Sequence, residues 1–563
     1  MIRNAEKSTI ERILIWTALL ATLAVTPWFS YDPINVPKLA IIVIGAFSSF
    51  GILSTTIIKS HFKAIRTEAL IVGLFIINLT IVLIFSGNNF YQEFFGTFGR
   101  ATGYVAYVAL SLIFLNSVFI SREHFVKKLA NVVLLAGLLS IMYGILQSFK
   151  IDPIDWVNPY SPVVGFLGNP NFQSSFVGFS GIVAFSYLLE KKITVGKRLT
   201  LMSYLVAATY VISTTDSQQG FLVLAGGIGI VCLIRVKNSK ISSALIPLSG
   251  LALVAIGFAT LGTLNRGPLS TLLYKLSVTY RGDYWRAGWK MTLEHPFLGV
   301  GLDSYGDWYR RSRTVEATLR RGPDIVSNAA HNVLLDLSSN GGFPLLVIYL
   351  MLMGLVLRAI TRLIKKSAAY DPTLAGLIAM WIAYQAQSII SLNQLGLAVW
   401  GWLISGAIIG FEVNTRSTEQ VQTAKPNKQK VKSAASIETT NILPKSLLGI
   451  FAGFLIGCVF GLPPVIASSK YLSALKSQDA TKVEKVALLW PQDSARMGQI
   501  VSALANAKLE TQALNVATIG VERFPDDYEL WNYIEKLPSA TAEQKAKAKS
   551  EMKRLDPNNP DLK

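Results

Sequence analysis

Long apolar runs alternate with short polar links along most of this chain. A hydrocarbon layer about 30 Å thick needs roughly 20 apolar residues, because each helical residue rises about 1.5 Å. Runs of that length recur up to about residue 468 and predict thirteen spans, near residues 12–28, 37–58, 68–87, 104–120, 128–148, 172–189, 199–214, 219–234, 242–262, 331–357, 373–392, 395–413 and 446–468. The pattern therefore predicts an all-α fold, a polytopic membrane helical bundle with about twelve core spans plus a thirteenth.

The charges of the links predict the orientation of these spans. If the N-terminus is cytoplasmic, every second link is basic, as the positive-inside rule requires. The basic residues of these links are Lys59, Lys63, Arg66, Arg122, Lys127, Lys128, Lys191, Lys192, Lys197, Arg198, Arg235, Lys237, Lys240, Arg358, Arg362, Lys365 and Lys366. A signal sequence is the alternative interpretation of the first span, since Lys7 and Arg12 precede it, but no clean A-x-A cleavage site follows.

The same pattern divides the chain into domains. Residues 1–413 form the predicted transmembrane domain, with a large outward loop at about 264–330. Residues 414–445 are polar, include Lys425, Lys428, Lys430 and Lys432, and have no apolar periodicity, which predicts a flexible cytoplasmic linker. The additional span at 446–468 then crosses outward, so residues 469–563 are expected outside the membrane.

Residues 469–563 have the pattern of a soluble helical-repeat domain. Trp490-Pro491, Phe524-Pro525 and Asp556-Pro557 each end an amphipathic run, at roughly the 34-residue spacing of a tetratricopeptide repeat. Concave surfaces of this kind bind peptides and proteins, so a protein partner of this tail is possible. A simple helical bundle is the alternative.

The composition excludes several classes of protein. Hydrophobic residues make up 51% of the chain and charged residues 15%, and the mean hydropathy is +0.42. The net charge of +19 does not indicate a nucleic-acid partner, because the basic residues lie mostly in short links between spans. Cys232 and Cys458 both lie in apolar runs, which argues against a disulfide framework or a thiolate metal site. No G-x-x-x-x-G-K-[ST] loop occurs, so a nucleotide-driven enzyme is disfavoured, and we expect neither a metal nor a cofactor.

The outward loop at about 264–330 breaks the charge rule that the other links follow. Its cations are Arg266, Lys275, Arg281, Arg286, Lys290, Arg310, Arg311, Arg313, Arg320 and Arg321. A guanidinium pairs bidentately with phosphate oxygens and keeps its charge at any physiological pH. The cluster therefore predicts an anionic ligand such as a lipid pyrophosphate, with the headgroups of membrane lipids as the alternative.

Two other outward segments carry candidate binding residues. Segment 96–104 contains three glycines, which let backbone amides approach a ligand, and Arg100 adds a fixed charge. Segment 168–172 contains Asn169 and Asn171. Their amides either hydrogen-bond sugar hydroxyls or cap the helix that begins there, and the sequence leaves both open.

His331 is the candidate catalytic base. It is one of four histidines, follows the arginine-rich loop and opens the span at 331–357. A histidine with the ordinary pKa near 6.5 accepts a proton at neutral pH, which is what an attacking hydroxyl requires. A structural role at a helix start is the alternative. Of the others, His61 and His124 fall in cytoplasmic links and His295 precedes a proline at a turn.

Three strings of this region resemble the signature of a known family. They are RGDYWRAGWKM from Arg281, HPFLGVGLDSY from His295 and AHNVLL from Ala330. They resemble the O-antigen ligase and polymerase superfamily, and Gly168–Asn171 and Gly99–Arg100 are similar to further motifs of that family. The resemblance covers about residues 80–360. It implies a bacterial inner-membrane location with a cytoplasmic N-terminus and a periplasmic tail.

The resemblance also implies an activity. Members transfer a glycan from an undecaprenyl-diphosphate donor to an acceptor hydroxyl on the outer face, without a nucleotide sugar or bound metal, and we expect inversion at the anomeric carbon. An arginine like Arg281 is thought to hold the diphosphate, and a histidine like His331 to assist the acceptor. We expect these two residues to be catalytic. The expected substrate-binding residues are Arg100, Arg286, Asn169, Asn171, Gln219 and Asn332.

One motif departs from the family pattern. Many members have Ser-Arg-Gly at the outer start of a span, where this chain reads Asp216-Ser217-Gln218-Gln219-Gly220. Either Arg100 or Arg286 supplies the second phosphate contact, or this branch handles a different donor geometry.

Several alternatives remain at this stage. The acceptor can be lipid A core, a growing polysaccharide, as in a repeat-unit polymerase, or a protein, as in an O-linked oligosaccharyltransferase. A glycan-lipid transporter is disfavoured, because transporters usually bury ionisable residues at mid-membrane and these spans are nearly free of them. A mere membrane anchor would not require a dozen spans.

Overall fold

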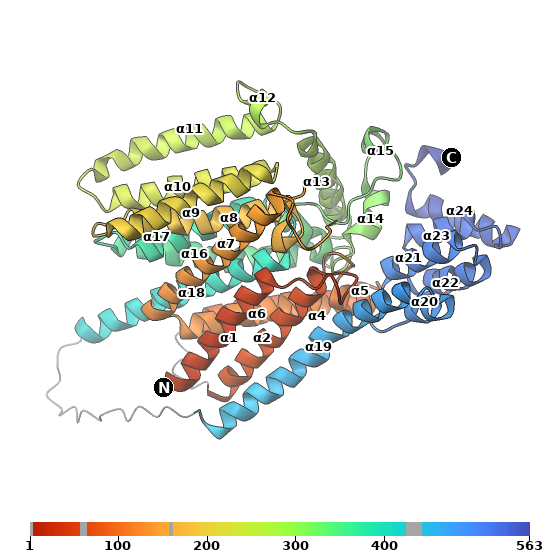
Figure 1. Ribbon diagram of the computed structural model, residues 1–563, viewed down its shortest axis with the longest axis horizontal. Helices are drawn as coiled ribbons and strands as arrows, with labels where there is room; N and C mark the ends of the chain where they lie inside the picture. Colours follow the sequence, from red (N-terminus) through yellow and green to blue (C-terminus); the bar gives the residue numbers. More distant parts are fainter. Residues whose placement is uncertain (1–3, 57–64, 157–160, 424–441, 563) are drawn as a thin grey trace.

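The computed structural model describes residues 4–56, 65–156, 161–423 and 442–562, and within these ranges every regular element is a helix and no strand occurs (Figure 1). Eight described helices are long and apolar enough to cross a membrane. The prediction of an all-α, polytopic membrane protein is confirmed.

A helix lies at each of the thirteen predicted spans. They are α1 (Asn4–Leu23), α2 (Asn35–Thr56), α4 (Arg66–Phe85), α6 (Tyr104–Ile120), α7 (Glu123–Ser148), α8 (Pro170–Leu188), α9 (Val195–Thr214), α10 (Gln218–Lys237), α11 (Leu245–Thr263), α16 (Val333–Lys366), α17 (Pro372–Ser388), α18 (Leu395–Thr423) and α19 (Pro444–Ser477). The eight that satisfy length and hydropathy together are α2, α4, α7, α10, α11, α16, α18 and α19, while α6 is apolar but shorter. The count of thirteen crossings stays a prediction.

Two helices continue beyond their predicted ends. α18 reaches Thr423, so the first part of the predicted 414–445 linker is helical. Residues 424–441 of that linker, with its four predicted lysines, lie outside the described residues, as do Lys59, His61 and Lys63. α19 has 34 residues, or about 51 Å of helix at 1.5 Å per residue, and it runs without a break from the bundle into the C-terminal domain (Figure 1).

A stripe of glycines brings α19 into backbone contact with α2. The glycines recur at every fourth position of α19: Gly449, Gly453, Gly457 and Gly461. A Cβ atom on Gly453 would lie 2.1 Å from the backbone oxygen of Phe47, and one on Gly449 would lie 2.3 Å from that of Gly51. Small residues at this spacing let two membrane helices approach closely, so α19 packs as part of the bundle.

The outward region between α11 and α16 consists of short helices. They are α12 (Ser270–Leu273), α13 (Leu276–Glu294), α14 (Tyr305–Ser312) and α15 (Val315–Arg321), and α5 (Phe90–Phe95) contributes from the link before α6. The C-terminal domain contains α20 (Ala480–Ala487), α21 (Ser494–Asn506), α22 (Glu510–Arg523), α23 (Tyr528–Lys536) and α24 (Ala542–Leu555) around its own apolar core. Successive helices of this domain pack on each other, and its relation to tetratricopeptide repeats stays a prediction.

Two arginines, Arg310 of α14 and Arg313 directly after it, hold the C-terminal domain against the region between α11 and α16. Arg313 Nη2 lies 2.6 Å from Asp556 Oδ2, and Arg310 Nη1 lies 3.2 Å from the same oxygen. Arg310 Nη2 also lies 2.6 Å from Glu529 Oε1. Asp556 and Arg313 are almost fully buried. Cations that the sequence suggested for an anionic ligand are thus used to dock the tail.

We predict that Asp556→Asn loosens this docking. Arg313 would remain buried without its ion-pair partner, and breaking a buried pair in this way costs about 3–5 kcal/mol. Hydrogen–deuterium exchange of the purified protein should rise in residues 305–325 and 524–562 and stay unchanged in α6. Asp561→Asn, at an exposed carboxylate of the same domain, is the control, and equal exchange in the two variants would contradict the docking role.

Candidate functional site

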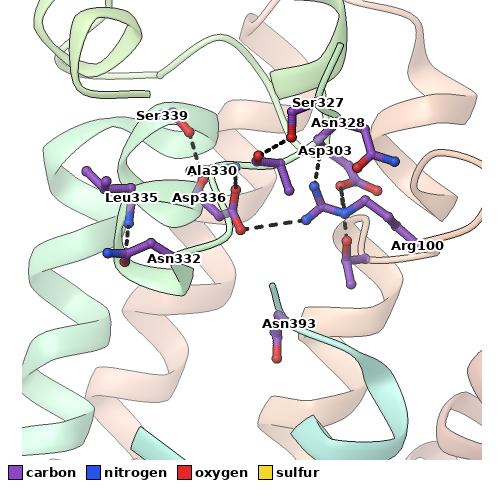
Figure 2. A network of polar contacts seen from close by, with 12 residues as sticks. Arg100, Asp303, Ser327, Asn328, Ala330, Asn332, Leu335, Asp336, Ser339 and Asn393 are labelled. Carbon is purple, nitrogen blue, oxygen red and sulfur yellow. Dashed lines mark hydrogen bonds and ion pairs between the residues drawn. The ribbon is translucent and has the colours of Figure 1, made fainter. Parts of the chain in front are cut away.

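Arg100 is the centre of a buried polar network at the end of the bundle where the turn at 96–103 meets the chain leading into α16 (Figure 2). Its Nε lies 3.3 Å from Asp303 Oδ1, its Nη2 lies 3.9 Å from Asp336 Oδ2, and its Nη1 donates to the backbone oxygen of Asn328. Burial disfavours the charged guanidinium, but the Asp303 and Asp336 carboxylates outweigh this and raise the pKa of Arg100. The network therefore joins three segments that lie far apart in the sequence.

Asp303 also holds the glycine-rich turn that carries Arg100. Its Oδ2 accepts from the backbone N–H of Thr97 at 2.8 Å, and its Oδ1 accepts from the hydroxyl of Thr102 at 3.0 Å. Gly96 has a φ of +90°, and a Cβ there would meet the backbone of Thr102 at 2.4 Å. Only glycine fits this position, so the turn serves to place Arg100.

The chain makes a tight hook where it enters α16. Asp336 Oδ1 accepts from the backbone N–H of Ala330 at 2.7 Å. Asn332 Oδ1 caps α16 by accepting from Leu334 N at 3.0 Å and Leu335 N at 3.2 Å. His331 lies between these two anchors with a φ of +54°. A left-handed backbone at a histidine is uncommon and persists only where its surroundings enforce it.

The imidazole of His331 packs on Tyr284, with ring centroids 5.5 Å apart and the planes tilted by 29°. Arg321 Nη1 donates to the hydroxyl of Tyr284, and its guanidinium lies over the ring of Tyr280, 4.3 Å from the centroid. Residues of α13, α15 and the start of α16 thus converge on one ring.

Arg281 is a cation without a carboxylate partner. Its side chain is partly buried and makes no ion pair or hydrogen bond among the described residues. Burial lowers the pKa of this guanidinium below its ordinary value. A desolvated charge of this kind is costly unless an anion approaches, so Arg281 is suited to an anionic ligand.

Three arginines lie close enough to His331 to change the pKa of its imidazole. Burial first, and then the positive charges of Arg281, Arg100 and Arg321, lower its pKa to about 3. The imidazole is therefore neutral at physiological pH, and its protonation in the free protein is unfavourable. The same charges would stabilise an anion bound beside it.

The structure does not bring Arg286 into this group. Its side chain is exposed, and its Nη1 lies 3.8 Å from Asp283 Oδ1. Five residues separate it from Arg281 on α13, which corresponds to about 140° around a helix of 3.6 residues per turn. Arg286 therefore faces away from Arg281. Arg100 is near His331, but its charge is balanced by two carboxylates.

Asn169, Asn171 and Gln219 form a second polar cluster, at the starts of α8 and α10. Asn169 Oδ1 accepts from the backbone N–H of Asn171 at 2.9 Å, which is the helix cap that the sequence left open. Asn171 Oδ1 accepts from the Ser217 hydroxyl at 2.7 Å. Gln219 is buried, and its Oε1 has no hydrogen-bond partner among the described residues.

Lys275 brings a cation to the segment that departs from the family motif. Its Nζ donates to the backbone oxygen of Asp216 at 2.8 Å. Lys275 directly precedes α13 and lies five residues before Tyr280. A positive charge therefore lies beside Asp216–Gly220, although no arginine occurs in that stretch.

Sequence reasoning missed several members of the site. Tyr284, Asp303 and Asp336 are not among the candidate residues, and Arg321 is one of ten cations in the loop. Tyr284 and Asp303 both lie inside the signature strings, so a search of those strings for polar and aromatic side chains would have found them. No group of three or more possible metal ligands occurs in the described part of the chain.

Residues 203–350 match the family model described as O-Antigen ligase. The match covers about a quarter of the chain and includes Arg281, Arg321, His331 and Asp336, but neither Arg100 nor the C-terminal domain. It supports, at the level of the family, a membrane ligase that transfers glycans. No curated protein matches the chain.

We predict that Arg281→Gln weakens the binding of inorganic pyrophosphate to the purified protein. Loss of a charge-assisted hydrogen bond costs about 1.5–3 kcal/mol, which corresponds to roughly a 10- to 100-fold higher Kd in calorimetry. Arg286→Gln removes the same charge from the same helix on its other side and should change the Kd little. Equal weakening by both variants would show that only the general charge of the loop matters.

Proposed function

We propose that this protein transfers a glycan from undecaprenyl diphosphate to an acceptor hydroxyl at the outer face of the bacterial inner membrane. The observation that carries the proposal is the His331 imidazole packed on Tyr284, to which Arg321 also donates, with Arg281 close by, and neither arginine is paired with a carboxylate among the described residues. The acceptor is a lipid, a glycan or a protein. The N-terminus would be cytoplasmic and the C-terminal domain periplasmic.

The proposed reaction is a single displacement. The acceptor hydroxyl oxygen forms a bond to the anomeric carbon, and its proton moves to His331. The bond from that carbon to the diphosphate oxygen breaks, and its electron pair leaves with undecaprenyl diphosphate. The configuration at the anomeric carbon is inverted, and this sequence of steps requires no metal.

The arginines have two effects in this scheme. Arg281 and Arg321 neutralise the charge that develops on the leaving diphosphate, and removing such a group commonly lowers the rate by about 10²–10³. The same charges make the imidazolium of His331 unfavourable. A bound diphosphate offsets them, so donor binding would raise the pKa of His331 and strengthen it as a base. This couples proton acceptance to the presence of donor.

We predict that His331→Ala lowers transfer by about 10²–10⁴, the usual contribution of a general base. The assay is the purified protein with lipid-linked glycan, followed by mass spectrometry of the modified acceptor. His295→Ala is the matched control, because His295 packs on Trp308 and takes no part in the scheme. Transfer at the wild-type rate by His331→Ala would refute the catalytic assignment.

Arg281 offers a second test in the same assay. Arg281→Lys keeps the charge but loses the bidentate fork, so we expect a substantial loss of transfer. Unchanged donor affinity in this variant would count against the phosphate role.

The pH profile provides a separate prediction. A base works only when deprotonated, and a pKa of about 3 keeps His331 neutral in the free protein far below pH 6.5. The kcat/KM value should therefore show no acid limb from this group between pH 8 and 5.5, where a histidine with the ordinary pKa of 6.5 would lose about tenfold. A wild-type midpoint near 6.5 that disappears in His331→Gln would contradict the burial and arginine effects described above.

A further inference from the structure

A cavity of about 320 Å³ lies between the C-terminal domain and the outward face of the bundle. Its walls come from the α1–α2 link with the start of α2, from α5, the turn at 96–101, α14, segment 326–328 and α19, and from two parts of the C-terminal domain: the start of α21 and the turn between α22 and α23. We call it the interdomain pocket. Its volume is at the lower end of the range of about 300–1,000 Å³ for small-molecule sites.

The interdomain pocket is acidic. Six carboxylates line it, against two arginines: Asp32, Asp307, Asp493, Asp526, Asp527 and Glu529. Arg310 is already paired with Glu529 and Asp556, and Arg496 Nη2 donates to the backbone oxygens of Leu489 and Pro491 at 2.6 and 2.7 Å. Asp526 is likewise paired, with Arg311 and Arg554. The other four carboxylates, Asp32, Asp307, Asp493 and Asp527, make no ion pair among the described residues, so a phosphate would be repelled here, in contrast to the site of Arg281 and His331.

The pKa of Asp307 reflects both its burial and the neighbouring carboxylates. Burial, followed by the charge of Asp527, raises the pKa of Asp307 to about 7. Its one described hydrogen bond is accepted from Gln92 Nε2 at 2.6 Å. A ligand that donates hydrogen bonds to these carboxylates and carries no negative charge would stabilise them.

The remaining walls combine aromatic rings with unpartnered polar atoms. The aromatic residues are Tyr31, Tyr91, Phe95, Phe98, Tyr471, Phe524 and Tyr528. Gln492 Oε1 and Arg496 Nε are buried and have no hydrogen-bond partner among the described residues. An aromatic face fits the apolar side of a ligand, and a hydroxyl both donates and accepts, so it satisfies an acceptor such as Gln492 Oε1 and a donor such as Arg496 Nε. Saccharides offer both features in one molecule.

The interdomain pocket and the His331 site share one stretch of chain. Asn328 lines the pocket, its backbone oxygen accepts from Arg100, and His331 follows three residues later. Arg281, Arg321 and His331 do not line the pocket. A ligand held there would thus lie against the segment that leads to the proposed base, without competing for the cationic site.

We propose that the interdomain pocket binds the saccharide of the acceptor, as one or two sugar units without phosphate or other anionic groups. This inference rests on the proposed transfer reaction. It assigns the C-terminal domain a direct part in acceptor recognition, because α21 and the α22–α23 turn supply one side of the pocket.

The test is saturation-transfer NMR with the full-length protein in nanodiscs. The probes are the methyl glycosides of glucose, galactose, N-acetylglucosamine and glucosamine. Ala495→Trp adds an indole at the pocket wall, and Gln492→Ala removes an unpartnered acceptor. Ala546→Trp, on the exposed face of α24, is the matched control. At least one glycoside should bind the wild type and the control, bind Gln492→Ala several-fold more weakly, and give no signal with Ala495→Trp.

Three outcomes would overturn the proposal. They are no binding by any of the four glycosides, equal binding by wild type and Ala495→Trp, or binding of a lysine- and serine-rich peptide in place of the sugars, which would indicate a polypeptide acceptor. The assay requires no transfer and should give the same signals with His331→Ala. Sugar binding that Ala495→Trp abolishes would therefore support the pocket even if the transfer reaction proved wrong.

Discussion

The arrangement of α13–α16 and the C-terminal domain depends on which anionic group pairs with each buried guanidinium. A buried positive charge without a partner costs several kcal/mol, so its partner decides its role. Arg100 forms ion pairs with Asp303 and Asp336, and Arg313 forms one with Asp556. Arg281 receives no carboxylate among the described residues. The paired arginines hold the polar network together and attach the C-terminal domain, whereas Arg281 keeps a partly buried charge without a carboxylate among the described residues.

This division explains why a single loop can be both a scaffold and a site. The carboxylates that pair with Arg310 and Arg313 come from the C-terminal domain, and both guanidinium groups also donate to the backbone oxygen of Pro323. That oxygen lies eight residues before His331. The segment that leads into α16 is consequently held at two points. Arg310 and Arg313, which pair with the C-terminal domain, donate to Pro323, and Arg100 donates to Asn328.

The sequence was sufficient for the helices, because length and hydropathy are local properties, and it pointed to His331 and Arg281 as candidates, because both stand in the signature strings. It could not separate Arg281 from Arg310 or Arg313, since the carboxylate of Asp556 lies more than 240 residues away along the chain. The glycines of α19 were readable as a close-packing motif, but their partner α2 was not. Arg286 was a candidate for the second phosphate contact, and the turn of α13 places it on the side of the helix away from Arg281.

The unbroken α19 has a mechanical consequence. α19 continues past Pro463 and Pro464, is anchored to α2 by backbone contact, and reaches the C-terminal domain with Tyr471 packed 4.5 Å from Tyr31 between ring centroids. A tilt of α19 against α2 would therefore be passed on to the C-terminal domain, because the same helix contacts both.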